Sequence, residues 1–142
     1  MMAWSFYADD SDDNVTWAYG DGCRRCSSTP NSSGIRTFQH GWMGNTSLNY
    51  GSANSWDYKV DIVRSPLWEH VGESPQVFRC PADTSTARGK PRVRSMSMLN
   101  WVGGRGENRP MGWSASTGPW KIYRQLEDMN NPGPSSTFVF LD

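Results

Sequence analysis

Three cysteines carry the most obvious chemistry in this chain. Cys23 and Cys26 form a C-x-x-C pair, and Cys80 stands alone further along. A structural zinc site needs four ligands, but a second C-x-x-C pair is missing, and neither His40 nor His70 lies at zinc-finger spacing. The pair also lies in a Gly- and Ser-rich stretch, whereas a redox motif opens a helix after a strand. We therefore expect one disulfide, from Cys80 to either Cys23 or Cys26, with one thiol left over.

Acidic residues near the start have the spacing of a calcium loop. Asp10, Asp12 and Asn14 occupy positions 1, 3 and 5 of an EF-hand-like pattern, and Asp21 falls at position 12. The sixth position, which needs glycine for a sharp turn, is Val15, and the aspartate at the end is shorter than the usual bidentate glutamate. A solvated acidic turn after a helix explains the same residues and is the interpretation we favour. Calcium is the alternative, and no other cofactor is expected.

Tryptophan is abundant, with eight in a chain whose residues are only 36% hydrophobic. Flat aromatic rings can stack on the apolar faces of sugars. Trp42, Trp113 and Trp120 lie in Gly-rich stretches, so these three are the candidates for a glycan-binding platform. The alternative is that a chain poor in aliphatic residues fills its core with tryptophan, which we expect of Trp68.

Enzymatic motifs are absent. The chain has no G-x-S-x-G and no H-E-x-x-H, and residues 103–106 (GGRG) match neither a phosphate-binding loop nor a dinucleotide fingerprint. A glycosidase needs two carboxylates, one of them with a raised pKa. The 14 Asp and Glu residues supply so many pairs that their presence carries no information. Catalytic residues therefore stay unassigned, and the sequence favours a protein that is not an enzyme.

Length and charge bound the remaining classes. The 142 residues suit one domain, 1–142. The 14 Lys and Arg balance the 14 Asp and Glu, which predicts no nucleic-acid or anionic-membrane partner. No apolar run is long enough for a transmembrane helix, and no signal peptide opens the chain. Abundant Gly, Pro, Ser and Asn predict many loops, while the aromatic residues argue against disorder.

Local patterns predict few regular elements in the first half. Met2 and Phe6 stand at i, i+4 spacing, so residues 1–8 are predicted to be the end of a helix. Residues 20–55 lack periodicity and are predicted to be a loop-rich excursion. Residues 65–72 begin with Ser-Pro and end in Gly, which predicts a short helix.

The second half, residues 76–142, carries three strand candidates. These are 76–80, 92–101 and 136–141, and the last is the most apolar and is expected to be a central strand. In 92–101 the face that carries the methionines, together with Arg94, is expected to be the buried one. A helical start, a long loop region and a small antiparallel sheet make the predicted fold class α+β.

Four segments together resemble one family. They are residues 7–13 (YADDSDD), 78–83 (FRCPAD), 91–100 (PRVRSMSMLN) and 134–142 (PSSTFVFLD). Their order and spacing are similar to those of type II secretion pseudopilin-like proteins with prepilin-type cleavage and methylation signals. They frame nearly the whole chain.

The resemblance implies a structural subunit. In that family a leader, a cleavage site and a long apolar helix precede the Tyr-acid turn, and a His…Asp-Gly signature follows the last strand. The chain would therefore be the globular portion, with 1–8 as the remnant of the helix and an exposed apolar strip where the other parts would pack. The implied role is a head in a type II secretion or type IV pilus-like filament, with other pilin-like subunits as partners, in the periplasm or cell envelope.

For this fragment by itself, the resemblance implies a soluble monomer that is not attached to a membrane. Related pseudopilins use calcium to order a loop of the head, which keeps the calcium alternative open. The third cysteine, which is left over after one disulfide, would be explained if its partner lay in a removed segment.

A hypothesis from another class is a carbohydrate-active protein. It would be a glycan-binding module or a small glycoside hydrolase that uses tryptophan platforms and a carboxylate pair. The discriminating feature is whether two acids share a Trp-lined cleft, one of them with a perturbed pKa.

Overall fold

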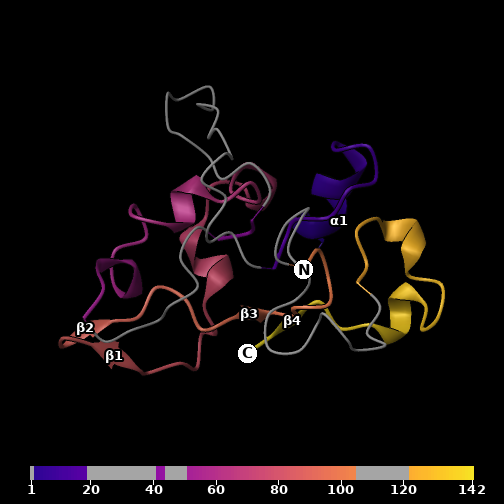
Figure 1. The fold of residues 1–142 in the computed structure, drawn as a ribbon. Coiled ribbons are helices and arrows are strands. Elements are labelled where there is room, and N and C mark those ends of the chain that lie inside the picture. The colour runs from indigo at the N-terminus through magenta and orange to yellow at the C-terminus, as the bar shows by residue number, and fades with distance from the viewer. Residues whose placement is uncertain (1, 19–40, 44–50, 105–121) are drawn as a thin grey trace.

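The computed structural model describes residues 2–18, 41–43, 51–104 and 122–142 (Figure 1). In this part of the chain a single α-helix is followed by a series of 3-10 turns and two small antiparallel sheets, each of two strands. The architecture is α+β and rich in loops, which confirms the predicted fold class. None of the helices in these four ranges is both long and apolar enough to span a bilayer.

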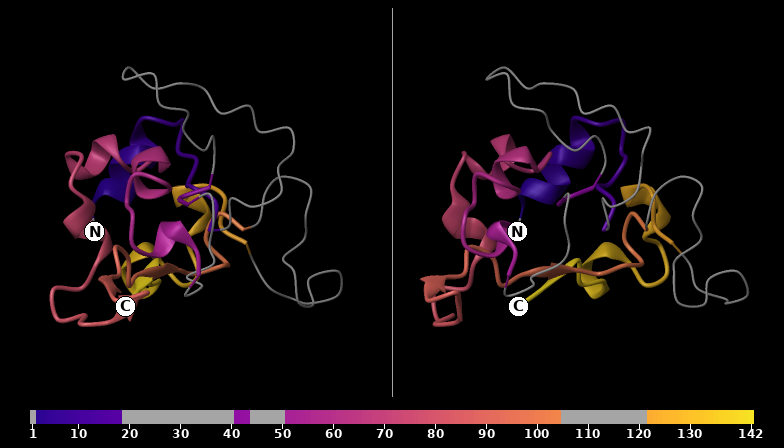
Figure 2. Two further views of the ribbon diagram at one scale, coloured as in Figure 1. Left: turned by 90° about the vertical axis from the view of Figure 1, so that its left-hand side faces the viewer. Right: turned by 60° about the vertical axis from the view of Figure 1, so that its left-hand side comes forward.

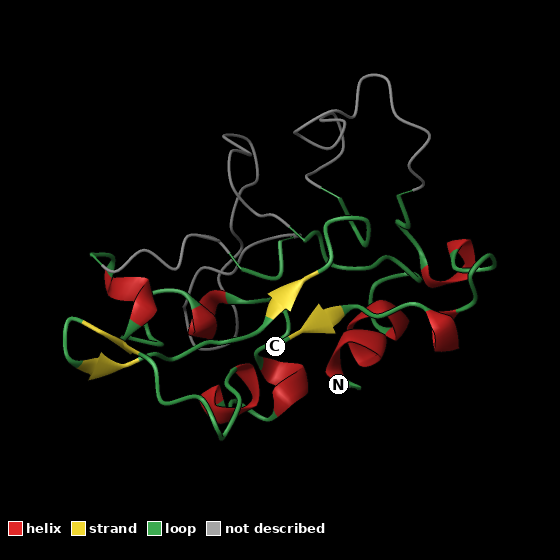
Figure 3. Cartoon of the chain, turned by 90° about the horizontal axis from the view of Figure 1, so that it is seen from below, coloured by secondary structure: helices red, strands yellow, loops and turns green. Residues whose placement is uncertain are grey.

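The elements are short. The helix α1 spans Ala3–Asp9, and the 3-10 helices are η1 (Ala53–Ser55), η2 (Ile62–Arg64), η3 (Glu69–Val71), η4 (Pro75–Phe78), η5 (Leu126–Asp128) and η6 (Pro134–Ser136). The strands are β1 (Thr86–Ala87), β2 (Lys90–Pro91), β3 (Ser97–Met98) and β4 (Phe140–Leu141). Figure 3 shows how much of the described chain runs as loop between them.

The helix α1 covers one side of the core. Its inner face buries Trp4 and Ala8, whereas Met2 at the N-cap and Phe6 on the outer face are 70% and 48% exposed. Edge-on contact of Tyr7 with the ring of His70, with centroids 5.9 Å apart, joins the helix to η3. The predicted helix at the start of the chain is confirmed.

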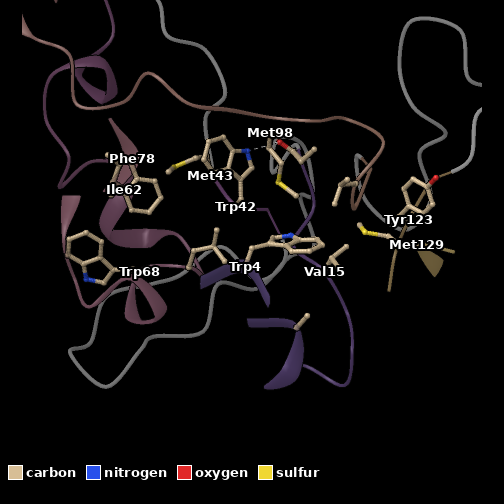
Figure 4. Close-up of a cluster of buried hydrophobic side chains, with 14 of the residues drawn as sticks. Trp4, Val15, Trp42, Met43, Ile62, Trp68, Phe78, Met98, Tyr123 and Met129 are labelled. Carbon is tan, nitrogen blue, oxygen red and sulfur yellow. Dashed lines mark hydrogen bonds between the residues drawn. The ribbon is translucent and has the colours of Figure 1, made fainter. Parts of the chain in front are cut away.

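The core gathers aromatic and sulfur-containing side chains from distant parts of the sequence (Figure 4). Its largest members are Trp4, Trp42, Met43, Ile62, Leu67, Trp68, Phe78, Met98, Tyr123 and Met129. The predicted burial of Trp68 is confirmed. Because aromatic rings bury large areas, a chain with few aliphatic residues can still close a core in this way.

The two sheets are minimal. In the first, β1 and β2 form a hairpin with Thr86 opposite Pro91, and Arg88 and Gly89 turn the chain with φ of 50° and 73°. Two positive φ values are the mark of the tight hairpin turn that matches strand twist. In the second, β3 pairs antiparallel with β4, so that Met98 lies opposite Phe140. This pairing brings the end of the chain beside residues 95–98.

Of the three strand predictions, the one over 92–101 held only for β3, the one over 136–141 held only for β4, and the one over 76–80 was wrong. Residues 76–80 were expected to be a strand, but Pro75–Phe78 form the 3-10 helix η4, because a proline at the first position presets a helical φ. Residues 136–141 were expected to be a central strand, but only β4 is extended and paired among them. Phe138 and Leu141 there are 52% and 53% exposed, which does not suit a central strand.

The short helix predicted over residues 65–72 was right in its ends and wrong in its type. The Ser65 hydroxyl accepts a hydrogen bond from the Leu67 N–H at 3.1 Å, and Gly72 closes the segment with φ 64°. Between them the chain makes turns and the 3-10 helix η3. Of the predicted loop region 20–55, residues 20–40 and 44–50 lie outside the described part of the chain.

Glycine is required at position 103, where three segments meet. The Gly103 N–H donates to the Tyr123 carbonyl oxygen at 2.7 Å, and its φ is 73°. A Cβ there would overlap the Thr16 carbonyl oxygen and lie 2.6 Å from the Trp17 Cα. Only a residue without a side chain lets these backbones approach so closely.

We predict that Gly103→Ala lowers the free energy of unfolding by about 3 kcal/mol or more, because backbone overlap adds to left-handed strain. The matched control is Gly72→Ala, which has a similar φ of 64° but nothing within 4 Å of the added Cβ. It should cost only about 1 kcal/mol. Urea denaturation midpoints of the two variants measure the difference, and equal midpoints would contradict the account.

Candidate functional site

An open polar cleft of about 550 Å³ lies between the base of the β1–β2 hairpin and the end of β4. Its lining residues are Cys80, Ala82, Asp83, Ser85, Arg92, Arg94, Ser95 and Asp142. Two cations, two carboxylates, two hydroxyls and a thiol therefore share one concave surface. The volume is in the range of small-molecule sites, and seven of the eight lining residues carry a polar or ionisable side chain.

One wall of the cleft is a tight turn after η4. The Asp83 Oδ1 accepts a hydrogen bond from the Ser85 N–H at 2.7 Å, the arrangement that makes aspartate common in turns. The Arg79 guanidinium donates to the Asp83 carbonyl oxygen, and its Nε lies 4.0 Å from the Asp83 Oδ2. The turn is thus fixed by its own side chains.

The opposite wall is held together by Ser95. Its Oγ accepts a hydrogen bond from the Cys80 N–H at 2.8 Å, and its N–H donates to the Phe78 carbonyl oxygen at 3.1 Å. The side chains of Ser95 and Cys80 also hydrogen-bond to the carboxylate of Asp142. These contacts, with the β3–β4 pairing, place Asp142 in the cleft.

Both cleft carboxylates are more acidic than usual. Hydrogen bonds from the Ser85 hydroxyl and N–H lower the pKa of Asp83, and the charges of Arg79 and Arg92 lower it further. Hydrogen bonds from Cys80 and Ser95 lower the pKa of Asp142, although the nearby Asp83 charge opposes this. Both groups are therefore ionised at neutral pH. A glycosidase acid needs the opposite, a carboxyl that keeps its proton.

Arg94 lines the cleft from within the protein and is only 4% exposed. Its guanidinium carbon lies 5.0 Å from the centroid of the Trp42 ring. Burial lowers the pKa of Arg94, and the charge of Asp61, which is also buried, partly offsets this. The expectation that the methionine-bearing face of this segment points inward is confirmed for Arg94 and Met98.

Trp42 is not an exposed platform. Its side chain is 2% exposed, its Nε1 donates to the Ala18 carbonyl oxygen at 3.0 Å, and its ring packs edge-on against Phe140 with centroids 5.2 Å apart. With Arg94 over the same ring, no sugar can reach it. The other two candidates, Trp113 and Trp120, lie outside the described residues.

The candidate calcium residues are only partly described. Asp10 is exposed, with its Oδ2 3.8 Å from the His70 Nδ1, and the Asn14 side-chain amide donates to the carbonyl oxygens of Ser11 and Asp12. Residue 21 lies outside the described ranges. Among the residues that are described, no three His, Cys, Asp or Glu side chains gather closely enough to hold a metal ion. Calcium binding therefore stays a prediction.

The cysteine pairing also stays a prediction. Cys80 is half-buried with a free thiol, and Cys23 and Cys26 lie outside the described part of the chain. What the sequence analysis missed is the cleft itself. The one local signal was the alternation of cationic side chains with smaller ones over residues 92–95. It was weak, because nothing local places residue 142 beside them.

Comparison with protein-family models, with curated proteins and with solved structures finds no match to this chain.

We predict that Asp142 stabilises the fold in a pH-dependent way. Its pKa in the folded state is below the ordinary value of 3.8. The stabilisation is therefore fully present above that value and is lost as the pH falls through the folded-state pKa. Asp142→Asn should unfold at a lower temperature than the wild type at pH 7, and the gap should close in acid. Thermal unfolding followed from pH 7 to pH 2 measures this.

The control for that experiment is Glu69→Gln, which removes an exposed carboxylate outside the cleft. It should unfold close to the wild-type temperature at pH 7. A constant gap between Asp142→Asn and the wild type at all pH values would show that ionisation of Asp142 does not contribute.

We predict that Arg94→Met lowers the free energy of unfolding by about 3–5 kcal/mol, because it removes a buried cation whose charge interacts with the buried Asp61. The double variant Asp61→Asn/Arg94→Met should recover much of this loss. Denaturation midpoints of both variants provide the measurement. A double variant as unstable as Arg94→Met alone would mean that the loss comes from packing against Trp42 rather than from charge.

Proposed function

We propose that this chain is the globular head of a pseudopilin-like structural subunit. In this proposal it joins other pilin-like subunits in a type II secretion or type IV pilus-like filament, in the periplasm or cell envelope. The four segments that resemble this family run from residues 7–13 to residues 134–142 and support the proposal from the sequence.

The observation that carries the proposal is the two-sided character of α1. Trp4 and Ala8 seal its inner face into the core, while Met2 and Phe6 leave the outer face apolar and exposed. A subunit that packs its helix on its own head and also on neighbouring subunits needs apolar side chains on both sides of the helix. An isolated soluble domain needs only the inner ones.

The contacts between α1 and η3 fit the same role. Tyr7 packs edge-on against His70, and the Asp10 Oδ2 lies 3.8 Å from the His70 Nδ1. One residue of η3 therefore contacts both the last turn of α1 and the residue that follows the helix. Burial raises the pKa of Tyr7, so its phenol stays neutral in this contact at physiological pH. The helix and the head would therefore move as one body in a filament.

The alternative of a hydrolase or glycan-binding module that uses tryptophan platforms receives less support. Of the described tryptophans, Trp4, Trp42 and Trp68 are buried and the others are half-buried. The two carboxylates that share the cleft, Asp83 and Asp142, both have lowered pKa values. Neither feature fits a proton donor in a Trp-lined cleft.

We predict that Phe6→Glu removes the protein from filaments without unfolding it. The gene is expressed in its native host with an epitope tag, and filaments are isolated from the cell envelope and probed for the tag. The variant should remain in whole-cell extracts and be lost from the filament fraction, because a charge at a subunit contact is costly to bury.

The matched control is Val60→Glu, the same kind of change at a 43% exposed apolar residue outside α1. It should enter filaments normally. The proposal fails if the wild-type chain is absent from the filament fraction, or if both variants enter it equally.

A further inference from the structure

Two cationic side chains from the β1–β2 hairpin converge on one indole ring. The Arg88 Cζ lies 5.7 Å and the Lys90 Nζ 5.8 Å from the centroid of Trp56. Trp56 itself is half-buried at the end of η1, where its backbone N–H donates to the Ala53 carbonyl oxygen at 3.1 Å. Attraction between the charges and the face of the ring holds both side chains near fixed positions.

The hairpin that carries these cations is anchored to the core. Ala87 in β1 is fully buried, and the Arg92 N–H extends the pairing beyond β2 by donating to the Ser85 carbonyl oxygen at 3.1 Å. The next residue, Val93, donates its N–H to the Ser55 carbonyl oxygen at 3.1 Å, which ties the hairpin to η1. The backbone that carries the charged groups is thus fixed before any ligand arrives, which lowers the entropy cost of binding.

No described carboxylate neutralises these two cations. The ion pairs of Asp10 with His70 and of Asp83 with Arg79 do not involve Arg88 or Lys90. Both side chains belong to exposed residues. An anion bound beside the ring is attracted by both charges.

A third cationic residue, Arg92, connects the hairpin with the cleft. Arg92 follows β2 directly and lines the cleft together with Ser85, while Asp83 and Asp142 supply ionised acceptors in the same cleft. Hydroxyl groups of a sugar both donate and accept hydrogen bonds, so a lining of carboxylates, serines and an arginine matches them. Figures 1 and 2 show the hairpin at one edge of the molecule, well apart from α1.

We propose that the hairpin and the cleft together bind an acidic polysaccharide. Sugar hydroxyls occupy the cleft, and carboxylates along the same chain contact Arg88, Lys90 and Arg92. The site is distinct from the filament-forming face proposed for α1, so either proposal can fail without the other.

The alternative polyanion is a single-stranded nucleic acid, and the geometry favours the sugar. Proteins that bind single strands stack bases on aromatic rings. Here Arg88 and Lys90 lie close to Trp56, and the ring serves to position them. The chain has a net charge of zero, and nucleic-acid-binding proteins are typically basic over a broad surface.

The test is calorimetric titration of the full chain with oligogalacturonate, a uronic-acid oligomer, at low and moderate salt. We expect binding that weakens with salt, because the contacts are exposed and screened. Arg88→Gln/Lys90→Gln should weaken the affinity at least about tenfold. The charge-matched control, Lys59→Gln/Arg124→Gln, removes two exposed cations outside the hairpin and the cleft and should change it less than about twofold.

A second variant tests the cleft. Ser85→Ala keeps the charges of the hairpin and should also weaken oligogalacturonate, while thermal unfolding confirms that each variant is folded. The proposal is overturned if oligogalacturonate does not bind, if a neutral galactose oligomer binds equally well, or if a single-stranded oligothymidine of equal charge binds as tightly.

Discussion

The packing of Arg94 over Trp42 is the contact on which the rest of this structure depends. The ring lies in the core, bonds to the Ala18 carbonyl oxygen and meets Phe140 of β4 edge-on, while the guanidinium reaches the wall of the cleft. One pair of side chains thus links the N-terminal segment, the C-terminal strand and the polar cleft. A charge so deeply buried is tolerable because the ring and Asp61 both compensate it.

The fold is stabilised with very little regular secondary structure among the described residues. Backbone groups that would pair in longer helices or sheets are instead satisfied by turns and by side chains, as in the hydrogen bonds made by Ser65, Asp83 and Ser95. Close backbone approach at Gly103 joins three segments that share no sheet. Stability therefore rests on specific local contacts around an aromatic core.

Two surfaces of different character result. The outer face of α1 presents Met2 and Phe6, whereas the hairpin presents Arg88 and Lys90 around Trp56. Apolar contact suits permanent assembly, and exposed charge suits a reversible, salt-sensitive ligand. A filament subunit that also holds an acidic polysaccharide would use the two surfaces for separate tasks.

Local patterns in the sequence determined the α+β class, the helical start of the chain, the glycine end at Gly72 and the inward face that holds Arg94. Each depends on neighbours a few residues apart. Only the tertiary structure decided that Trp42 is buried and that Asp142 joins the cleft. A lone tryptophan in a Gly-rich stretch has no period to reveal its environment, and the position of Asp142 depends on β3–β4 pairing across a long sequence separation.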